Sequence, residues 1–135
     1  FKKIILHYES TKFPDKVIKK IKSLKLEAWL AINPKTKIKE VLSRIKKVNG
    51  ILLMGVRPGK EHQDFRPSTL EKIRILKRIN KKVKIQVDGG VNEKTIKLLG
   101  KLKINAVNTG SFVSKAENPE EALTKLEKEF KLIAK

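Results

Sequence analysis

The chain has 135 residues and a formal net charge of +19 at pH 7, from 33 Lys or Arg against 14 Asp or Glu. It contains no cysteine, which excludes disulfides and thiolate metal sites, and it has no apolar stretch long enough to span a membrane as a helix. Its length and its hydrophobic fraction of 39% fit a single domain, residues 1–135, with a moderate core. No secretory signal is visible and Phe1 is not a methionine, so we expect the chain to begin partway through a longer protein. The lack of cysteine fits a cytoplasmic protein.

The excess of lysine raises the question of nucleic acid binding, because clustered cations bind phosphates and release counterions. The lysines are, however, spread along helix-like segments such as residues 16–25 and 70–82. The chain has one Tyr and one Trp, and its aromatic and basic residues are not interleaved in the way that stacks bases. We interpret the lysines as a solvated surface and expect only non-specific, salt-dependent binding to nucleic acid.

Apolar spacing along the chain predicts strands and helices in alternation. A strand at residues 2–8 is followed by a helix that Asp15 is expected to cap. A second strand at 26–32 leads to a helix with Ile38, Val41, Leu42 and Ile45 on one face. The continuous apolar run at 50–56 is typical of a strand covered on both faces.

The next helix is expected to begin at Ser68, which has the spacing of a capping box with Glu71. A strand at 83–87 then leads to a helix that begins at Asn92. A short strand at 104–109 is the fifth and last of the series.

The last helix has Asn118 as its N-cap and Pro119 at its first position. It completes five βα units, and strands separated by helices run parallel because the helix supplies the crossover. Two architectures fit five such units. One is a complete doubly wound sheet, and the other is part of a (β/α)8 barrel, which needs about 250 residues when whole.

Polar residues, glycines and one methionine cluster where the predicted strands end. They are His7-Tyr8-Glu9, Asn33-Pro34, Met54, Pro58-Gly59, Asp88-Gly89-Gly90 and Gly110-Ser111. The carboxyl ends of parallel strands share one edge of the sheet, where α/β proteins build their sites. Asp-Gly is a strong hairpin signal, but helical sequence follows it here, so Asp88 is a candidate site carboxylate.

Two of these loops, Gly89-Gly90 and Gly110-Ser111, carry glycine just before a helix starts. Glycine lets phosphate oxygens approach backbone N–H groups, and the last two βα loops of a barrel commonly bind a phosphate. The sequence therefore favours a phosphate site across both loops, with plain helix capping as the alternative.

Six blocks of the sequence, in order and with matching spacing, resemble the ribulose-phosphate 3-epimerase family over residues 4–114. They are ILHYES, LAINPKT, LLMGVRPGKEHQDF, LEKIRILK, IQVDGGVN and VNTGSFV. The resemblance implies a parallel (β/α)8 TIM barrel that acts in the pentose phosphate pathway. In it this chain is the carboxyl-terminal portion, a partial barrel whose five units correspond to strands four to eight.

The resemblance also implies a reaction, the epimerisation of D-ribulose 5-phosphate to D-xylulose 5-phosphate at C3. One acid removes the proton, an enediolate forms, and a second acid reprotonates the other face. A divalent metal (zinc, iron(II), manganese or cobalt) stabilises the enediolate. Asp88 matches one acid/base residue and one metal ligand. The second acid and the other ligands, two histidines and an aspartate, belong to strands two and three of the barrel.

The remaining site residues follow from the same matching. The phosphate-binding positions are Gly89, Gly90, Gly110 and Ser111, while Gly59 begins the loop that covers the substrate, Met54 lines the pocket and His7 has a supporting role. We expect the 135 residues alone neither to bind the metal tightly nor to epimerise. We also expect the open strand edges of a half-barrel to favour a homo-oligomer.

The chain departs from the family pattern at several positions. Lys60-Glu61-His62 replaces a segment with two glycines, Arg57 replaces a residue that is usually acidic, and Trp29 replaces a small residue. These changes indicate a divergent member, so a related ketohexose 6-phosphate is an alternative substrate. A non-catalytic sugar-phosphate-binding half-barrel and a basic nucleic-acid-associated protein are the alternatives from other classes.

Overall fold

The computed structural model describes residues 2–55, 67–109 and 111–134. Within these ranges the chain forms one parallel sheet whose strand order is the order of the sequence. The strands are β1 (Lys3–His7), β2 (Glu27–Ile32), β3 (Gly50–Met54), β4 (Lys84–Asp88) and β5 (Ala106–Asn108). Each of the five predicted strands is confirmed, and no strand end differs from its predicted position by more than two residues.

The helices alternate with these strands as the apolar spacing predicts. They are α1 (Pro14–Ser23), α2 (Ile38–Ile45), α3 (Pro67–Ile79), α4 (Glu93–Lys101), α5 (Ser111–Ser114) and α6 (Pro119–Ala134), with a 3-10 turn, η1, at Tyr8–Ser10. In the part of the chain that the structure describes, no helix combines the length and the apolarity needed to cross a membrane.

Two of the predicted helix starts are wrong for the same reason. Phe13 is the N-cap of α1 and Pro14 its first residue, so Asp15 lies inside the first turn and pairs with Arg44 of α2 at 3.2 Å instead. The helix α3 begins at Pro67, which places Ser68 within the helix rather than at its cap. Proline suits the first helical position because its φ is already helical and it has no N–H to satisfy there.

The other two predicted starts are confirmed. Asn92 Oδ1 accepts hydrogen bonds from the backbone N–H groups of Lys94 and Thr95, at 2.9 and 3.1 Å, and the Thr95 hydroxyl accepts from the Asn92 N–H. At the start of α6, Asn118 Oδ1 accepts from the Glu121 N–H at 3.1 Å. Both asparagines satisfy N–H groups that have no partner within the helix.

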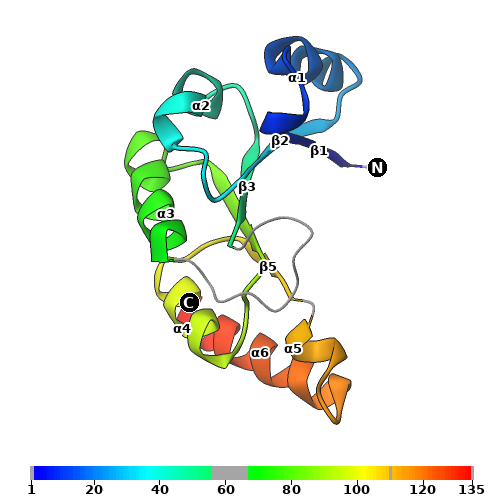
Figure 1. Cartoon of the computed structure of the whole chain (residues 1–135), viewed down its shortest axis with the longest axis vertical. Coiled ribbons are helices and arrows are strands. Elements are labelled where there is room, and N and C mark those ends of the chain that lie inside the picture. The colour runs from blue at the N-terminus through cyan, green and yellow to red at the C-terminus, as the bar shows by residue number, and fades with distance from the viewer. Residues whose placement is uncertain (1, 56–66, 110, 135) are drawn as a thin grey trace.

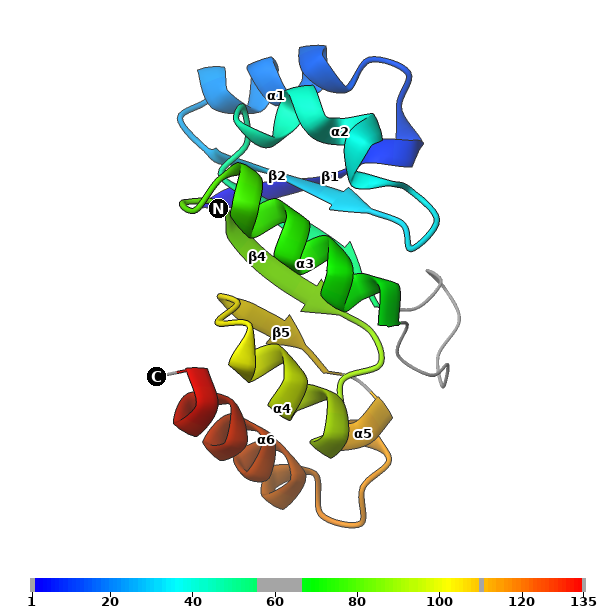
Figure 2. The same cartoon turned by 90° about the vertical axis from the view of Figure 1, so that its left-hand side faces the viewer.

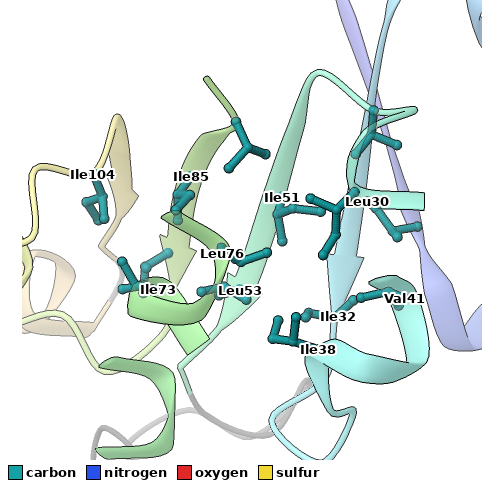
Figure 3. Close-up of a cluster of buried hydrophobic side chains, with 14 of the residues drawn as sticks. Leu30, Ile32, Ile38, Val41, Ile51, Leu53, Ile73, Leu76, Ile85 and Ile104 are labelled. Carbon is teal, nitrogen blue, oxygen red and sulfur yellow. The ribbon is translucent and has the colours of Figure 1, made fainter. Parts of the chain in front are cut away.

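One face of the sheet carries the apolar core. The helices α1, α2, α3, α4 and α6 lie on this side of the sheet (Figures 1 and 2). Each of them contributes side chains to a single buried cluster with alternate residues of the strands. Figure 3 shows Leu53 of β3 and Ile85 of β4 facing Ile73 and Leu76 of α3. Burial of these side chains is the main stabilising term of the fold.

The opposite face of the sheet carries the residues that alternate with the core positions. We call it the helix-free face, since the described helices that build the core all lie on the other side. Its members are Lys3, Ile5 and His7 of β1, Glu27, Trp29 and Ala31 of β2, Gly50, Leu52 and Met54 of β3, Lys84, Gln86 and Asp88 of β4, and Ala106 and Asn108 of β5.

The strand order decides between the two predicted architectures. A doubly wound sheet reverses its strand order once and thereby places helices on both faces. Here the order never reverses within the described residues, and right-handed crossovers then place every helix on one face, as in a barrel. The chain is therefore an α/β fold, a parallel partial barrel of five βα units.

Candidate functional site at the carboxyl edge of the sheet

The carboxyl edge of the sheet brings together Met54 and Asp88, two of the predicted strand-end residues, with Asn108, which was not predicted. Met54 of β3 is paired in register with Asp88 of β4, and Asp88 is paired with Asn108 of β5. Paired residues of parallel strands point to the same face, and adjacent strands lie about 4.8 Å apart. These three side chains therefore form one row on the helix-free face, and His7 ends β1 at the sheet's far side, where it is exposed.

The loop after β4 needs both of its glycines for its backbone shape. Gly89 has φ 94° and Gly90 has φ 72°, a left-handed conformation that residues with a Cβ rarely adopt. The Gly55 N–H donates to the Asp88 carbonyl at 2.6 Å, and the Thr95 hydroxyl donates to the Gly90 carbonyl at 2.8 Å. The turn that carries Asp88 is thus held from β3 on one side and from α4 on the other.

The start of α4 is already occupied by a protein acceptor. Because Asn92 takes the N–H groups of Lys94 and Thr95, these donors are not available to a phosphate. For this helix the predicted alternative of plain capping is what the structure shows. A phosphate at this edge would have to use the backbone N–H groups of Gly89 and Gly90 and those of the loop after β5.

The side chain of Asp88 is half-buried at the end of β4. Within residues 2–55, 67–109 and 111–134, no hydrogen-bond donor or cation contacts its side-chain oxygens. A carboxylate in that setting keeps its lone pairs available to accept a proton or to bind a cation.

The loop after β2 is organised by residues whose role the sequence did not reveal. Glu9 accepts from the Asn33 N–H at 2.6 Å and from the Thr36 hydroxyl at 2.7 Å. Lys72 of α3 donates to the carbonyls of Asn33 and Pro34, at 3.1 and 2.7 Å. The segments HYE and NPKT therefore contact each other. Both follow the carboxyl end of a strand, and this shared position is the sequence signal that could have predicted the contact.

A second feature that the sequence did not reveal is a line of polar side chains on the helix-free face. Lys3 Nζ donates to Gln86 Oε1 at 2.9 Å, and Gln86 Nε2 donates to Asn108 Oδ1. The Lys3 ammonium also lies 4.1 Å from the centre of the Trp29 ring, a cation–π contact. The signal was Gln86 itself, a polar residue between two apolar ones in a buried strand.

Comparison with known proteins decides the family. The model of the ribulose-phosphate 3 epimerase family matches residues 1–114, which include every strand and the whole carboxyl edge. The chain belongs to this family.

Curated ribulose-phosphate 3-epimerases are similar over most of the chain. The protein of Schizosaccharomyces pombe is 31% identical over 120 residues, which cover 89% of this chain and 53% of that protein. The protein of Buchnera aphidicola subsp. Baizongia pistaciae is 40% identical over 114 residues, 82% of this chain and 48% of that protein. This epimerase-family chain thus spans about half the length of the curated relatives it matches.

Solved structures support the same fold. The 3-hexulose-6-phosphate synthase of Salmonella typhimurium, a TIM-barrel enzyme, superposes with a TM-score of 0.75 and 13% sequence identity. The match covers 98% of this epimerase-family chain and 63% of that one. At this identity the likeness concerns the fold, and it supports the partial barrel.

Some predicted site residues of the epimerase-family chain lie outside the residues that the structure describes. Gly59 and Gly110 lie outside the described residues, as does the segment Arg57 to His62. Ser111 is the first residue of α5, but its side chain is not described.

The described residues do not by themselves fit a metal site. No group of three or more His, Cys, Asp or Glu comes together within them. Divalent transition metals need at least three protein ligands in most catalytic sites, and Asp88 would supply one.

One group beside the edge has a shifted pKa. Glu93, the first residue of α4, forms a hydrogen bond and an ion pair with Lys125 of α6, which raises the pKa of Lys125. The pair joins the helix that follows the Asp88 turn to the last helix of the chain.

Proposed function

We propose that the carboxyl edge of the sheet binds a phosphorylated ketose and contributes to the epimerisation of D-ribulose 5-phosphate to D-xylulose 5-phosphate at C3. The observation that carries this proposal is the position of Asp88, in a row with Met54 and Asn108 on the helix-free face of an epimerase-family chain. We further propose that the five units correspond to strands four to eight of the family's barrel, and that the reaction serves pentose phosphate metabolism in the cytoplasm.

The chemistry needs two acids on opposite sides of the reacting carbon. Asp88 takes the proton from C3 or returns it, while the electron pair of the broken C–H bond moves into the enediolate. The second acid reprotonates C3 from the other face. The described carboxyl edge offers Asp88 for one of these roles, so we propose that the 135 residues alone bind the ketose without epimerising it.

We assign the remaining predicted positions to binding. Gly89 and Gly90, with Gly110 and Ser111, would hold the phosphate through backbone N–H groups. Met54, next to Asp88 in register, would line the pocket. Gly59 would begin the covering loop, and His7, at the far side of the sheet, would support the edge without touching the reacting carbon.

A divalent metal (zinc, iron(II), manganese or cobalt) remains a proposal in which Asp88 is one ligand. The described residues supply no further ligands to complete such a site, so we derive no step through it. The same observation favours a second candidate function, a half-barrel that binds sugar phosphates without catalysis. The altered residues at 57 and 60–62 leave a ketohexose 6-phosphate as the alternative substrate.

The test is a chimera that places the amino-terminal part of the Schizosaccharomyces pombe relative before this chain. We expect the chimera to incorporate deuterium at C3 of ribulose 5-phosphate in D2O and to release xylulose 5-phosphate. Asp88→Asn in the chimera should lower the rate by about 10²- to 10⁴-fold, the range for removing a general acid or base. A folded chimera that binds the ketose but exchanges no C3 proton would support the non-catalytic function instead.

We also propose that the chain self-associates. The strands β1 and β5 end the sheet, and within the described residues no strand pairs with their outer edges. Unpaired edge strands favour pairing with another chain. Light scattering after size-exclusion chromatography should give a mass above that of a monomer, and a monomer at all concentrations would contradict the proposal.

A further inference from the structure

The line of polar side chains on the helix-free face leads to the row that contains Asp88. It begins at Lys3 on β1, crosses to Gln86 on β4 and ends at Asn108 on β5. Gln86 is two residues before Asp88 on the same strand and the same face, while Asn108 is the register partner of Asp88. The line therefore ends beside the candidate carboxylate.

The lysine at one end fixes the orientation of both amides. An ammonium group can only donate, so the Gln86 atom that Lys3 contacts must be the carbonyl oxygen, Oε1. The Gln86 amino group then points the other way and donates to Asn108, whose facing atom must be Oδ1. The amino group of Asn108, Nδ2, is consequently turned away from Gln86.

The amino group of Asn108 lies at the end of this line of polar side chains. Within residues 2–55, 67–109 and 111–134, no oxygen accepts a hydrogen bond from Asn108 Nδ2, and the residue is half-buried. This partly exposed amino group is therefore available to donate to an acceptor that a bound molecule brings.

The far end of the line is held in place by packing. The Lys3 ammonium lies over the Trp29 ring, and Trp29 is only 4% exposed although it stands on the helix-free face. A Cβ on Gly50 would come within 2.6 Å of that ring, so the ring lies directly against the β3 backbone. The stacked ring limits the positions open to the Lys3 side chain, and through it those of Gln86.

We propose that Asn108 is a substrate-binding residue of this edge, whose Nδ2 donates to a carbonyl or hydroxyl oxygen of the ketose beside Asp88. Gln86 and Lys3 are positioning residues that keep the amino group facing the ligand. This inference rests on the proposed function, because it takes the ketose to lie next to Asp88. A donor that is already oriented stabilises charge that develops on a ketose oxygen without having to reorganise.

The main test is Asn108→Asp, which keeps the acceptor for Gln86 Nε2 and replaces the donor by an oxygen. We expect the affinity of the 135-residue chain for D-ribulose 5-phosphate to fall about tenfold, the loss of one well-placed hydrogen bond. The matched control is Asn105→Asp at the other end of β5, which adds the same charge and keeps the acceptor for the Ile85 N–H. It should leave the affinity unchanged.

Inorganic phosphate separates hydrogen bonding from charge repulsion. If Asn108 contacts the ketose, Asn108→Asp should weaken the binding of ribulose 5-phosphate far more than the binding of inorganic phosphate. Equal losses for both ligands would overturn the proposal, since repulsion by the new carboxylate would then explain them.

Gln86→Glu tests the positioning role. The introduced carboxylate can pair with Lys3 but cannot donate to Asn108 Oδ1, so the Asn108 amide should rotate and lose its outward donor. The affinity for ribulose 5-phosphate should fall as it does in Asn108→Asp, and an unchanged affinity would contradict the role.

Side-chain amide signals in 1H–15N NMR spectra report ligand contact separately from any effect of a substitution on folding. On addition of ribulose 5-phosphate, we expect the Asn108 NH2 signals, assigned by their loss in Asn108→Asp, to shift together with the amides of Gly89 and Gly90. Shifts at the glycines alone would refute the role of Asn108 and leave the proposed function standing. Shifts at neither place would refute both.

Discussion

The two faces of the sheet are built from the same strands, and alternate residues of each strand belong to opposite faces. In β4, Ile85 and Val87 are 0% exposed in the core, whereas Gln86 and Asp88 alternate with them on the helix-free face. Contacts in the core are apolar and depend little on direction. On the helix-free face, Lys3, Gln86 and Asn108 are joined by hydrogen bonds, whose donors and acceptors are fixed in direction.

This difference teaches that one short strand can serve stability and binding independently. Because side chains alternate with a period of two, a change on one face leaves the other face's contacts in place. Substitutions of neighbouring residues on one strand therefore provide the most direct way to separate the two roles.

The largest effect is expected from Ile85→Ala on the core side of β4. It removes a fully buried side chain and should lower the free energy of unfolding by about 2–5 kcal/mol. Gln86→Ala, one residue further on the opposite face, should cost about 1 kcal/mol through its lost hydrogen bonds. Urea unfolding followed by circular dichroism measures both, and equal losses would break the distinction between the faces.

A smaller loss is expected from Gly50→Ala, which tests the packing of the helix-free face. The new Cβ would lie 2.6 Å from ring carbons of Trp29, so the ring must shift, at a cost of about 1–3 kcal/mol. Trp29 is the chain's one tryptophan, and its fluorescence should change with the shift. Trp29→Leu should relieve most of the loss in the double variant, and a full loss there would argue against this contact.

Lys3→Met should have a weaker effect on stability, about 1 kcal/mol or less, because it removes one hydrogen bond and one partly exposed cation–π contact. Trp29 fluorescence should nevertheless report the lost ammonium. Lys2→Met at the neighbouring exposed position is the matched control, and it should change neither quantity.

The smallest effect concerns pH and Lys77 of α3. Burial, together with repulsion from Lys103, lowers the pKa of Lys77 below its ordinary value of 10.5. Between the lowered pKa and 10.5 the unfolded chain binds more protons at this site, so stability from this group rises with pH across that window. Compared with Lys77→Met, the natural chain should gain stability as pH rises toward 10.5 in chemical unfolding, and parallel curves would contradict the shift.

Much of the fold could be predicted from the sequence, because its signals are local. The alternation of strands and helices, the caps Asn92 and Asn118, and the gathering of strand-end residues at one edge all depend on short spacings or on parallel pairing. The wrong starts at Asp15 and Ser68 came from weighing the capping residue above the proline before it.

The rest could not be predicted because it depends on strands far apart in the sequence. Lys3 and Gln86 are 83 residues apart and meet only because the sheet brings β1 and β4 to one face. Trp29 lies against Gly50 because of the register between β2 and β3, which no local pattern specifies. Asn108 could likewise not be distinguished in the sequence from any other polar residue near a strand end, because its hydrogen bond to Gln86 depends on the pairing of β4 with β5.

Each described strand after β1 pairs with the strand that precedes it in the chain. During synthesis on a ribosome, each emerging strand would therefore find its partner already formed, and no backbone pairing would wait for a distant segment. The same order means that a whole βα unit can be attached beside β1 or β5 while every existing pair of strands keeps its register.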